Sequence, residues 1–513
     1  MLGIHSLSPS AGFGMANGVS NPCCPCCIPA GAHAHLRGLE LWNTKVLRET
    51  AKEIMAKGVW ENISAAKREA LLSSIPPEWI IPANIIPPEP QNDVTPFPEN
   101  SGWLTSEEPK ITNTPAHEIL DKTTSGVWTA EAVTRAFCKR AAAAHQLTPI
   151  LPRPGSPSGP LHGLPISLKD NFNVIGKDST LGFSAWVNDP ATYNSVLTNL
   201  LRDAGAVLYV KTNVPTAMMI AETVNNVFGR TTNPRNRLLT SGGSSGGESA
   251  LIAFGGSPLG VGTDIGGSLR IPAAVTVTNS QPWLKDPKCI PIPWRNVEPK
   301  KKLKIGIMWD DGMVRPTPPV RRALKETAEK LQKAGHEVVD WAPTGHDKAN
   351  DILDRFFLSD GGKSVQKLLS LSDEPIRPEM ERYGRAVDRG VYELWQLHAE
   401  RNTLQKEYID RWSTAGLDAI LSVEHGKFKH VGYTGVYNIL DYSCLSFPCN
   451  VTVDQAIDIP RTDEAPLSDV DEQVQKEYNP SAIHGMPVSL QLVGRRLEEE
   501  KVIMMGQVIL KAL

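Results

Sequence analysis

The sequence predicts an α/β fold in which strands and helices form packed layers. Short β-like runs alternate with helical runs, and residues 303–308, 320–333 and 338–341 follow one another as strand, helix and strand. Hydrophobic residues make up 41% and charged residues 21% of the 513 residues, which is ordinary for a globular protein. Because such strands and helices bury their apolar faces against each other, we expect a layered α/β core.

The N-terminal region predicts a tail followed by helices. Residues 1–35 are rich in Gly, Pro, Ser, Ala and Cys, a composition typical of a flexible tail, whereas residues 36–513 are expected to form a single domain. Apolar residues recur near helical spacing over 36–57 and again over 62–74, after which two prolines follow. The domain is therefore expected to begin with two helices.

The next part of the chain predicts one helix and two strands between proline-rich breaks. Residues 82–98 indicate extended surface chain, and the five prolines within 147–160 exclude a regular helix there. Residues 129–145 begin with threonine and continue with helix formers. The runs PISL at 165–168 and AVLYV at 206–210 predict strands.

Charge and hydropathy exclude several classes of protein. The net charge is −3 and there is no extended basic block, which disfavours nucleic-acid binding. The uncharged stretch 249–263 has only 15 residues, too few to span a bilayer. The first 35 residues lack lysine and arginine, unlike a secretory or mitochondrial leader, so we expect a soluble protein in the cytoplasm.

The eight cysteines do not form a disulfide framework. The tight cluster Cys23–Cys27 lies in the predicted tail and lacks the spacing of a zinc site, so we interpret it as part of that tail. Cys444 and Cys449 lie in an apolar segment, where buried, unreactive thiols are expected.

Two glycine-bracketed serine clusters within residues 241–273 carry the strongest functional signal. Ser268 follows two glycines, which let successive backbone N–H groups turn toward one point and hold an oxyanion. Ser244 lies 24 residues earlier, and its hydroxyl can both donate and accept a proton. Lys169 ends an apolar run, so burial would make its amine a base, provided that Asp170 points elsewhere. The pattern predicts a hydrolase.

Five segments then carry a family resemblance: GPLHGLPISLKDNFNVIG, AVLYVKTNVPTAM, SGGSSGGESALIAFGGSPLGVGTDIGGSLRIPAA, VGYTGVYNILDYSCLSFP and HGMPVSLQLVGRRLEEE. With them, most of residues 60–513 closely resembles the amidase signature hydrolases, especially fungal acetamidase-like members, and is also similar to fatty acid amide hydrolases. The resemblance implies a mixed central β-sheet flanked by helices on both faces.

The resemblance also implies the chemistry. It places the acyl-forming serine on Ser268, the bridging serine on Ser244 and the base on Lys169. It implies a substrate-facing Met218 and oxyanion contacts from the backbones of Ile265, Gly266, Gly267 and Ser268. The expected reaction is hydrolysis of a carboxylic amide, with small aliphatic amides as substrates, no metal or organic cofactor, and the amide as the partner molecule.

The sequence departs from the family pattern at three places. Segments that family members carry have no counterpart after His145, after Ala274 and near Val423. The second gap begins a few residues beyond Ser268 and would remove elements that brace the catalytic loop. A catalytically inactive or misfolded relative, acting at most as a binding protein, is therefore the alternative.

Other functional patterns have weaker support. Residues 242–246 also match G-x-S-x-G, in which Ser244 would attack with the help of a downstream histidine such as His425, His430 or His484. However, no strand of five or six apolar residues leads into that motif. His425 and His430 lack a third ligand at metal-site spacing, and the glycine runs lack a nucleotide-binding pattern.

Overall fold

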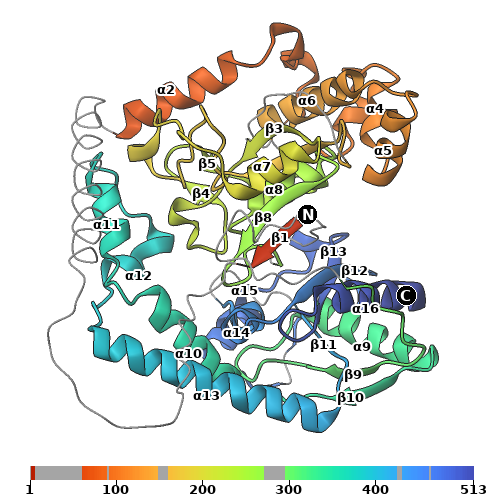
Figure 1. Ribbon diagram of the computed structural model, residues 1–513, viewed down its shortest axis with the longest axis vertical. Coiled ribbons are helices and arrows are strands. Elements are labelled where there is room, and N and C mark those ends of the chain that lie inside the picture. The colour runs from red at the N-terminus through yellow and green to blue at the C-terminus, as the bar shows by residue number, and fades with distance from the viewer. Residues whose placement is uncertain are drawn as a thin grey trace, which may run out of the picture.

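Most of the described strands lie in two large sheets (Figure 1). The computed structural model describes residues 2–5, 60–88, 92–147, 160–270, 295–423, 430–461 and 464–513. Within these residues, a parallel four-stranded sheet has the order β1 (Leu2–His5), β8 (Gly260–Asp264), β2 (Pro165–Lys169) and β3 (Val207–Thr212). A mixed five-stranded sheet has the order β10 (Glu337–Asp340), β9 (Lys304–Ile307), β11 (Ala419–Ser422), β13 (Pro487–Val493) and β12 (Cys444–Thr452).

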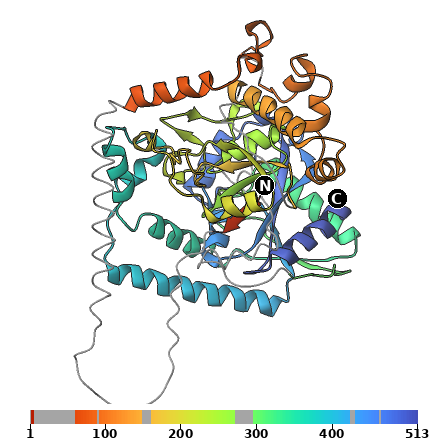
Figure 2. The same ribbon diagram turned by 45° about the horizontal axis from the view of Figure 1, so that its top comes forward.

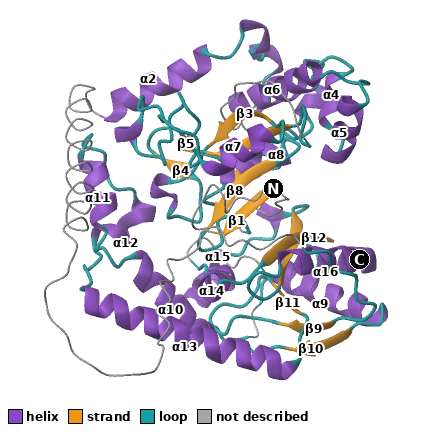
Figure 3. Ribbon diagram, viewed as in Figure 1, coloured by secondary structure: helices purple, strands orange, loops and turns teal. Residues whose placement is uncertain are grey.

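Helices account for much of the remaining described chain (Figure 3). They are α2 (Trp60–Ser73), α3 (Phe97–Asn100), α4 (Glu108–Thr112), α5 (Ala116–Thr124), α6 (Ala130–Leu147), α7 (Val196–Asp203), α8 (Gly246–Ala253), α9 (Pro318–Lys333), α10 (His346–Phe357), α11 (Lys363–Ser370), α12 (Glu381–Gly384), α13 (Val391–Ala415), α14 (Gly432–Leu440), α15 (Asp469–Glu477) and α16 (Glu499–Ala512). Two short hairpins pair β4 (Val224–Asn225) with β5 (Gly229–Arg230) and β6 (Thr232–Asn233) with β7 (Asn236–Thr240). In Figure 1 and Figure 2, α2 and α13 lie at opposite ends of the molecule.

Each sheet has its own hydrophobic core. The four-stranded sheet packs against α6 and α8, with Phe137, Leu168 and Phe254 among the buried side chains. The five-stranded sheet packs against α9 and α16, and its core extends to α10, α13 and α14. Burial of large apolar side chains in both clusters is the main favourable contribution to folding.

The α/β class and most elements predicted from the sequence are confirmed. The predicted helices at 62–74 and 129–145 correspond to α2 and α6, and β9, α9 and β10 form the predicted parallel β-α-β unit. Among the described strands, the mixed central sheet implied by the resemblance is represented by the four-stranded and the five-stranded sheets.

The expectation of extended surface chain over 82–98 is wrong in part. Val94 and Phe97 are buried in the core around α6, and the stretch contains a 3₁₀ turn at Ala83–Ile85 and the start of α3. The prolines are compatible with these short turns because proline is tolerated in the first turn of a helix.

Part of the predicted tail forms a strand. Leu2–His5 is β1 and pairs in parallel with β8, from Leu2 opposite Val261 to His5 opposite Asp264. The remainder of residues 1–35, with the Cys23–Cys27 cluster, and the predicted helix at 36–57 lie outside the described residues. The boundary between tail and domain at residue 35 stays a prediction.

Candidate active site

Lys169 is a buried amine at the end of β2. Its side chain has no exposed surface, and its Nζ donates to Ser244 Oγ at 2.7 Å, to Thr263 Oγ1 at 2.9 Å and to Thr263 O at 3.2 Å. Burial lowers the pKa of Lys169 to about 7, although the carboxylates of Asp264 and Glu248 oppose this shift. A substantial fraction of the amine is therefore neutral near pH 7 and can accept a proton.

The carboxylate of Asp170 points away from Lys169. Successive side chains of a strand face opposite sides of the sheet. On its side, Asp170 accepts from the Leu181 N–H at 2.8 Å and lies 3.4 Å from Lys211 Nζ. The requirement stated for a basic Lys169, that Asp170 points elsewhere, is therefore met.

Ser244 lies in the turn that leads into α8. Its hydroxyl is buried and is the acceptor for Lys169. At Gly247, in the first turn of α8, a Cβ atom would lie 2.5 Å from Asn213 N, so only glycine lets the helix approach the end of β3 this closely. The glycines of this motif thus set the distance between helix and sheet that brings Ser244 to Lys169.

Ser268 lies in a loop after β8 that is folded around the Asp264 carboxylate. Asp264 accepts from the N–H groups of Gly267 at 2.8 Å, Leu269 at 3.0 Å and Arg270 at 3.3 Å. The Ser268 carbonyl accepts from the Ser245 N–H at 3.1 Å, which joins the two serine segments through the backbone. Ser268 itself is buried.

The predicted oxyanion donors have different environments. The Gly267 N–H donates to Asp264, and Gly267 has φ +123°. The side chain of Ile265 is exposed, and the carbonyl of Gly266 accepts from Thr434 Oγ1 at 2.8 Å. This contact fixes the peptide plane between Gly266 and Gly267 from a different part of the chain.

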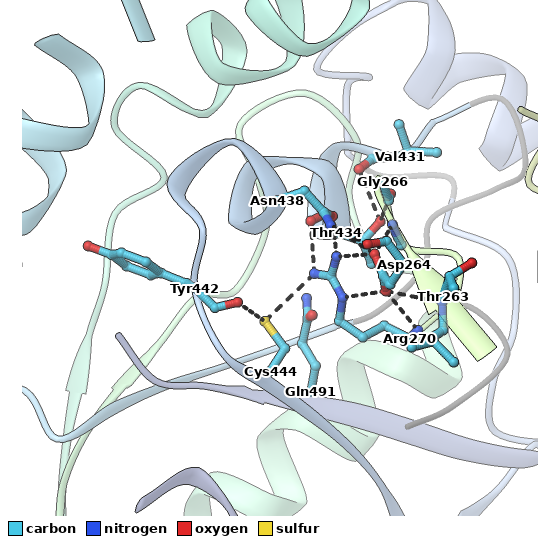
Figure 4. Close-up of polar contacts among 12 residues, drawn as sticks. Thr263, Asp264, Gly266, Arg270, Val431, Thr434, Asn438, Tyr442, Cys444 and Gln491 are labelled. Carbon is cyan, nitrogen blue, oxygen red and sulfur yellow. Dashed lines mark hydrogen bonds and ion pairs between the residues drawn. The ribbon is translucent and has the colours of Figure 1, made fainter. Parts of the chain in front are cut away.

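Sequence reasoning missed the polar network beneath this loop (Figure 4). Arg270 is buried and forms a fork with Asp264, with Nε–Oδ2 and Nη2–Oδ1 distances of 3.1 Å each. Arg270 also donates to Thr434 O at 2.8 Å and to Asn438 Oδ1, both on α14. Burial opposes the charge of Arg270, but Asp264 outweighs it and raises its pKa. The network ties the Ser268 loop to α14.

Met218 lies at the end of the 3₁₀ turn Thr216–Met218. It is half-buried and has φ +58°, and Ala217 before it has φ +59°. Two consecutive non-glycine residues in the left-handed region are strained, and such strain concentrates at functional sites. The substrate-facing role of Met218 stays a prediction.

Two of the three histidines considered for other functions have partners elsewhere. His430 is buried and paired with Asp311 at 2.5 Å, and His484 Nδ1 accepts from the Gln455 N–H at 3.3 Å. His425 lies outside the described residues. Among the residues that the structure covers, no group of three or more His, Cys, Asp or Glu side chains could hold a metal ion. In the expected unreactive pair, Cys449 is buried and Cys444 is half-buried.

Comparison with known proteins decides the family. The model of the family Amidase matches residues 120–279 and 275–503. The chain belongs to the amidase family. This amidase is 36% identical to an acetamidase of Emericella nidulans, over 88% of this chain and 98% of the relative. It is also 36% identical to an acetamidase of Aspergillus oryzae, over 90% and 100% of the two chains.

The fold of the amidase is shared with solved structures. A fatty acid amide hydrolase superposes with a TM-score of 0.82 and 29% identity, covering 90% of this chain and 96% of the other. A 6-aminohexanoate cyclic dimer hydrolase superposes with a TM-score of 0.61 at 17% identity, covering 79% and 97%, a similarity of fold alone. Within the described part of the amidase, no helix is both long and apolar enough to cross a membrane.

The relatives of this amidase are longer in the aligned region. The match to the Emericella nidulans acetamidase extends over 543 residues, more than the 513 of this chain, so the relative contains residues without a counterpart here. The two pieces of the family match meet at residues 275–279, where the sequence predicts the second gap. The positions of all three gaps stay predictions.

Proposed function

We propose that this amidase hydrolyses small aliphatic carboxylic amides through an acyl-enzyme formed on Ser268. The observation that carries the proposal is the buried Lys169 amine at 2.7 Å from Ser244 Oγ. An amine with a pKa lowered to about 7 is a base suited to neutral pH, and a serine hydroxyl beside it can relay a proton. Ser244 in turn neighbours Ser245, whose N–H is bonded to the carbonyl of Ser268.

The proposed reaction has two halves. Ser268 Oγ attacks the amide carbonyl while its proton passes through Ser244 Oγ to Lys169 Nζ. The C–N bond then breaks, and the proton returns through Ser244 to the leaving nitrogen, which departs as ammonia or an amine. Water attacks the resulting ester along the same proton path, which releases the carboxylic acid and restores Ser268.

The oxyanion is assigned to backbone N–H groups of the Ser268 loop. Ile265, Gly266 and Ser268 supply donors, and the Gly267 N–H joins them only by leaving Asp264. One such donor contributes about 3 kcal/mol to transition-state stabilisation. The acetamidase names of two relatives support a small aliphatic acyl group, which we place against Met218.

A serine-directed covalent probe tests this proposal. The purified chain is incubated with a fluorophosphonate, the labelled peptide is mapped, and ammonia release is measured with acetamide, butyramide and hexanamide. We expect label on Ser268, its loss in Ser268→Ala, and strong attenuation in Ser244→Ala and Lys169→Ala. Ser249→Ala is the matched control, because Ser249 lies on α8 and bonds to Ser241 O and Gly246 O.

The other outcomes separate the alternatives. Label on Ser244 that survives in Ser268→Ala would assign the nucleophile to the G-x-S-x-G motif. A folded protein that takes no label and releases no ammonia would favour the alternative, a catalytically inactive relative that acts at most as a binding protein. Release of ammonia from hexanamide but not from acetamide would keep the mechanism and replace the substrate class.

A further inference from the structure

Glu248 is a fully buried carboxylate four residues after Ser244. It lies in the first turn of α8 and has no exposed surface. Its Oε2 accepts from Ser167 Oγ on β2 at 2.6 Å, and its Oε1 accepts from Thr212 Oγ1 on β3 at 2.6 Å. Both oxygens are thus used to hold α8 against two neighbouring strands.

Both hydroxyls that bind Glu248 are placed next to Lys169 by the sheet. Ser167 precedes Lys169 by two positions on β2, so the two side chains face the same side of the sheet. Thr212 is the direct partner of Lys169 in the parallel register of β2 and β3. Glu248 therefore binds one residue on the same strand as Lys169 and one residue on the neighbouring strand.

Strand β8 leaves room for the Glu248 carboxylate. A Cβ atom on Gly260, which is opposite Ser167 in β8, would lie 2.0 Å from Glu248 Oε2. Glycine at this position lets the carboxylate lie directly against the sheet backbone. The sheet is thus shaped to accept Glu248 beneath Lys169.

Lys169 is influenced by the carboxylates of Asp264, from the end of β8, and Glu248, from α8. Asp170 and Lys211 are paired on the opposite face of the sheet. Tyr209 on β3 is also near Glu248, and its hydroxyl donates to Gly256 O.

We propose that Glu248 is a positioning residue that fixes the Lys169–Ser244 contact by joining α8 to β2 and β3 and that favours the protonated form of Lys169. This inference rests on the proposed function, in which Lys169 takes the proton of Ser268. Glu248 exchanges no proton in the reaction. Its negative charge stabilises the ammonium that forms as Ser268 attacks, and in a buried site such a charge acts with little screening.

Two opposing influences set the ionisation of Glu248. Burial raises its pKa to about 7, and the hydrogen bonds from Ser167 and Thr212 and the charge of Lys169 oppose that rise. The two hydroxyls therefore favour the ionised carboxylate that the proposal requires.

The pH profile of kcat/KM separates the effect of the Glu248 charge from the effect of its hydrogen bonds to the sheet. Glu248→Gln keeps the length and one acceptor but removes the charge, so its acid limb should move to lower pH by about one unit and its plateau should fall. Glu248→Asp keeps the charge but is too short for both hydroxyls, so its limb should stay near wild type while its plateau falls. Glu374→Gln is the matched control, because Glu374 is another buried carboxylate, bonded to the Ser184 hydroxyl at 2.6 Å.

An unmoved acid limb in Glu248→Gln, with the wild type active, would overturn the role of Glu248 and leave the proposed function standing. Absence of hydrolysis in the wild type would overturn the proposed function instead. In that case a thermal double-mutant cycle of Glu248→Gln and Lys169→Met at pH 7, where both groups are partly ionised, decides about Glu248. Non-additive Tm changes support the link between the two residues, and additive changes overturn it.

Discussion

Replacing Asp264 by asparagine tests the network beneath the Ser268 loop. The carboxylate forms a fork with buried Arg270 and accepts three backbone N–H groups, so Asp264→Asn leaves the guanidinium without its counter-charge. Removing one partner of a buried ion pair costs about 3–5 kcal/mol. Unfolding entropies of about 2.1 cal/mol/K per residue give about 1 kcal/mol per degree for a chain of this size, so Tm should fall by about 3–5 °C.

The assay is a double-mutant cycle with Arg270→Met, followed by thermal unfolding. Each single variant leaves one charged partner uncompensated, whereas the double variant removes both charges. The double variant should therefore lose at least about 2 °C less than the sum of the two single losses. Asp354→Asn is the control, since its ion pair with Arg382 is exposed and its loss should change Tm by less than about 1 °C. Additive losses, or a loss below about 1 °C for Asp264→Asn, would refute the reasoning.

Two further predictions concern Lys169 and Gly260. Because the pKa of Lys169 is lowered from 10.5 to about 7 on folding, the unfolded state binds more protons between these values, and wild-type stability should rise with pH there. Relative to Lys169→Met, the wild type should gain about 2–3 kcal/mol from pH 7 to pH 9 in urea unfolding, and parallel curves would contradict this. Gly260→Ala places a Cβ at 2.0 Å from Glu248 and should cost about 3 kcal/mol and most of the activity. Gly384→Ala, with its nearest contact at 3.4 Å, should cost less than about 1 kcal/mol in the same unfolding assay, and equal losses would contradict the steric argument.

The elements that the sequence predicted best are those whose signal is local. The strand at 165–168 and the unit formed by β9, α9 and β10 follow from short apolar runs and helical periodicity, and both are present. Lys169 and Ser244 were singled out by residue type and glycine neighbours, and the fold brings them within hydrogen-bond distance. In each case the information lies within a few residues of the feature.

The features that the sequence did not predict depend on distant partners. Arg270 finds Asn438 across 168 positions, and no periodic pattern marks either residue. Glu248 resembles an ordinary acidic residue in the first turn of a helix, a position usually explained by the helix dipole. Its burial depends on the hydroxyls of Ser167 and Thr212 and on Gly260, which lie on three different strands. Val94 and Phe97 were assigned to the surface because the prolines around them indicated extended surface chain. Both side chains are buried in the core.

The proposed active site depends on both cores of the molecule. Lys169 and Ser244 belong to the four-stranded sheet and α8, but the Ser268 loop is held from the other side by α14. Tyr433 and Val436 anchor α14 in the core of the five-stranded sheet. The contact of Thr434 with Gly266 and that of Asn438 with Asp264 transmit the position of this helix to the loop. Because these contacts are buried and directional, loosening the second core should displace Ser268, the proposed nucleophile, relative to Lys169, the proposed base, even where neither residue is altered.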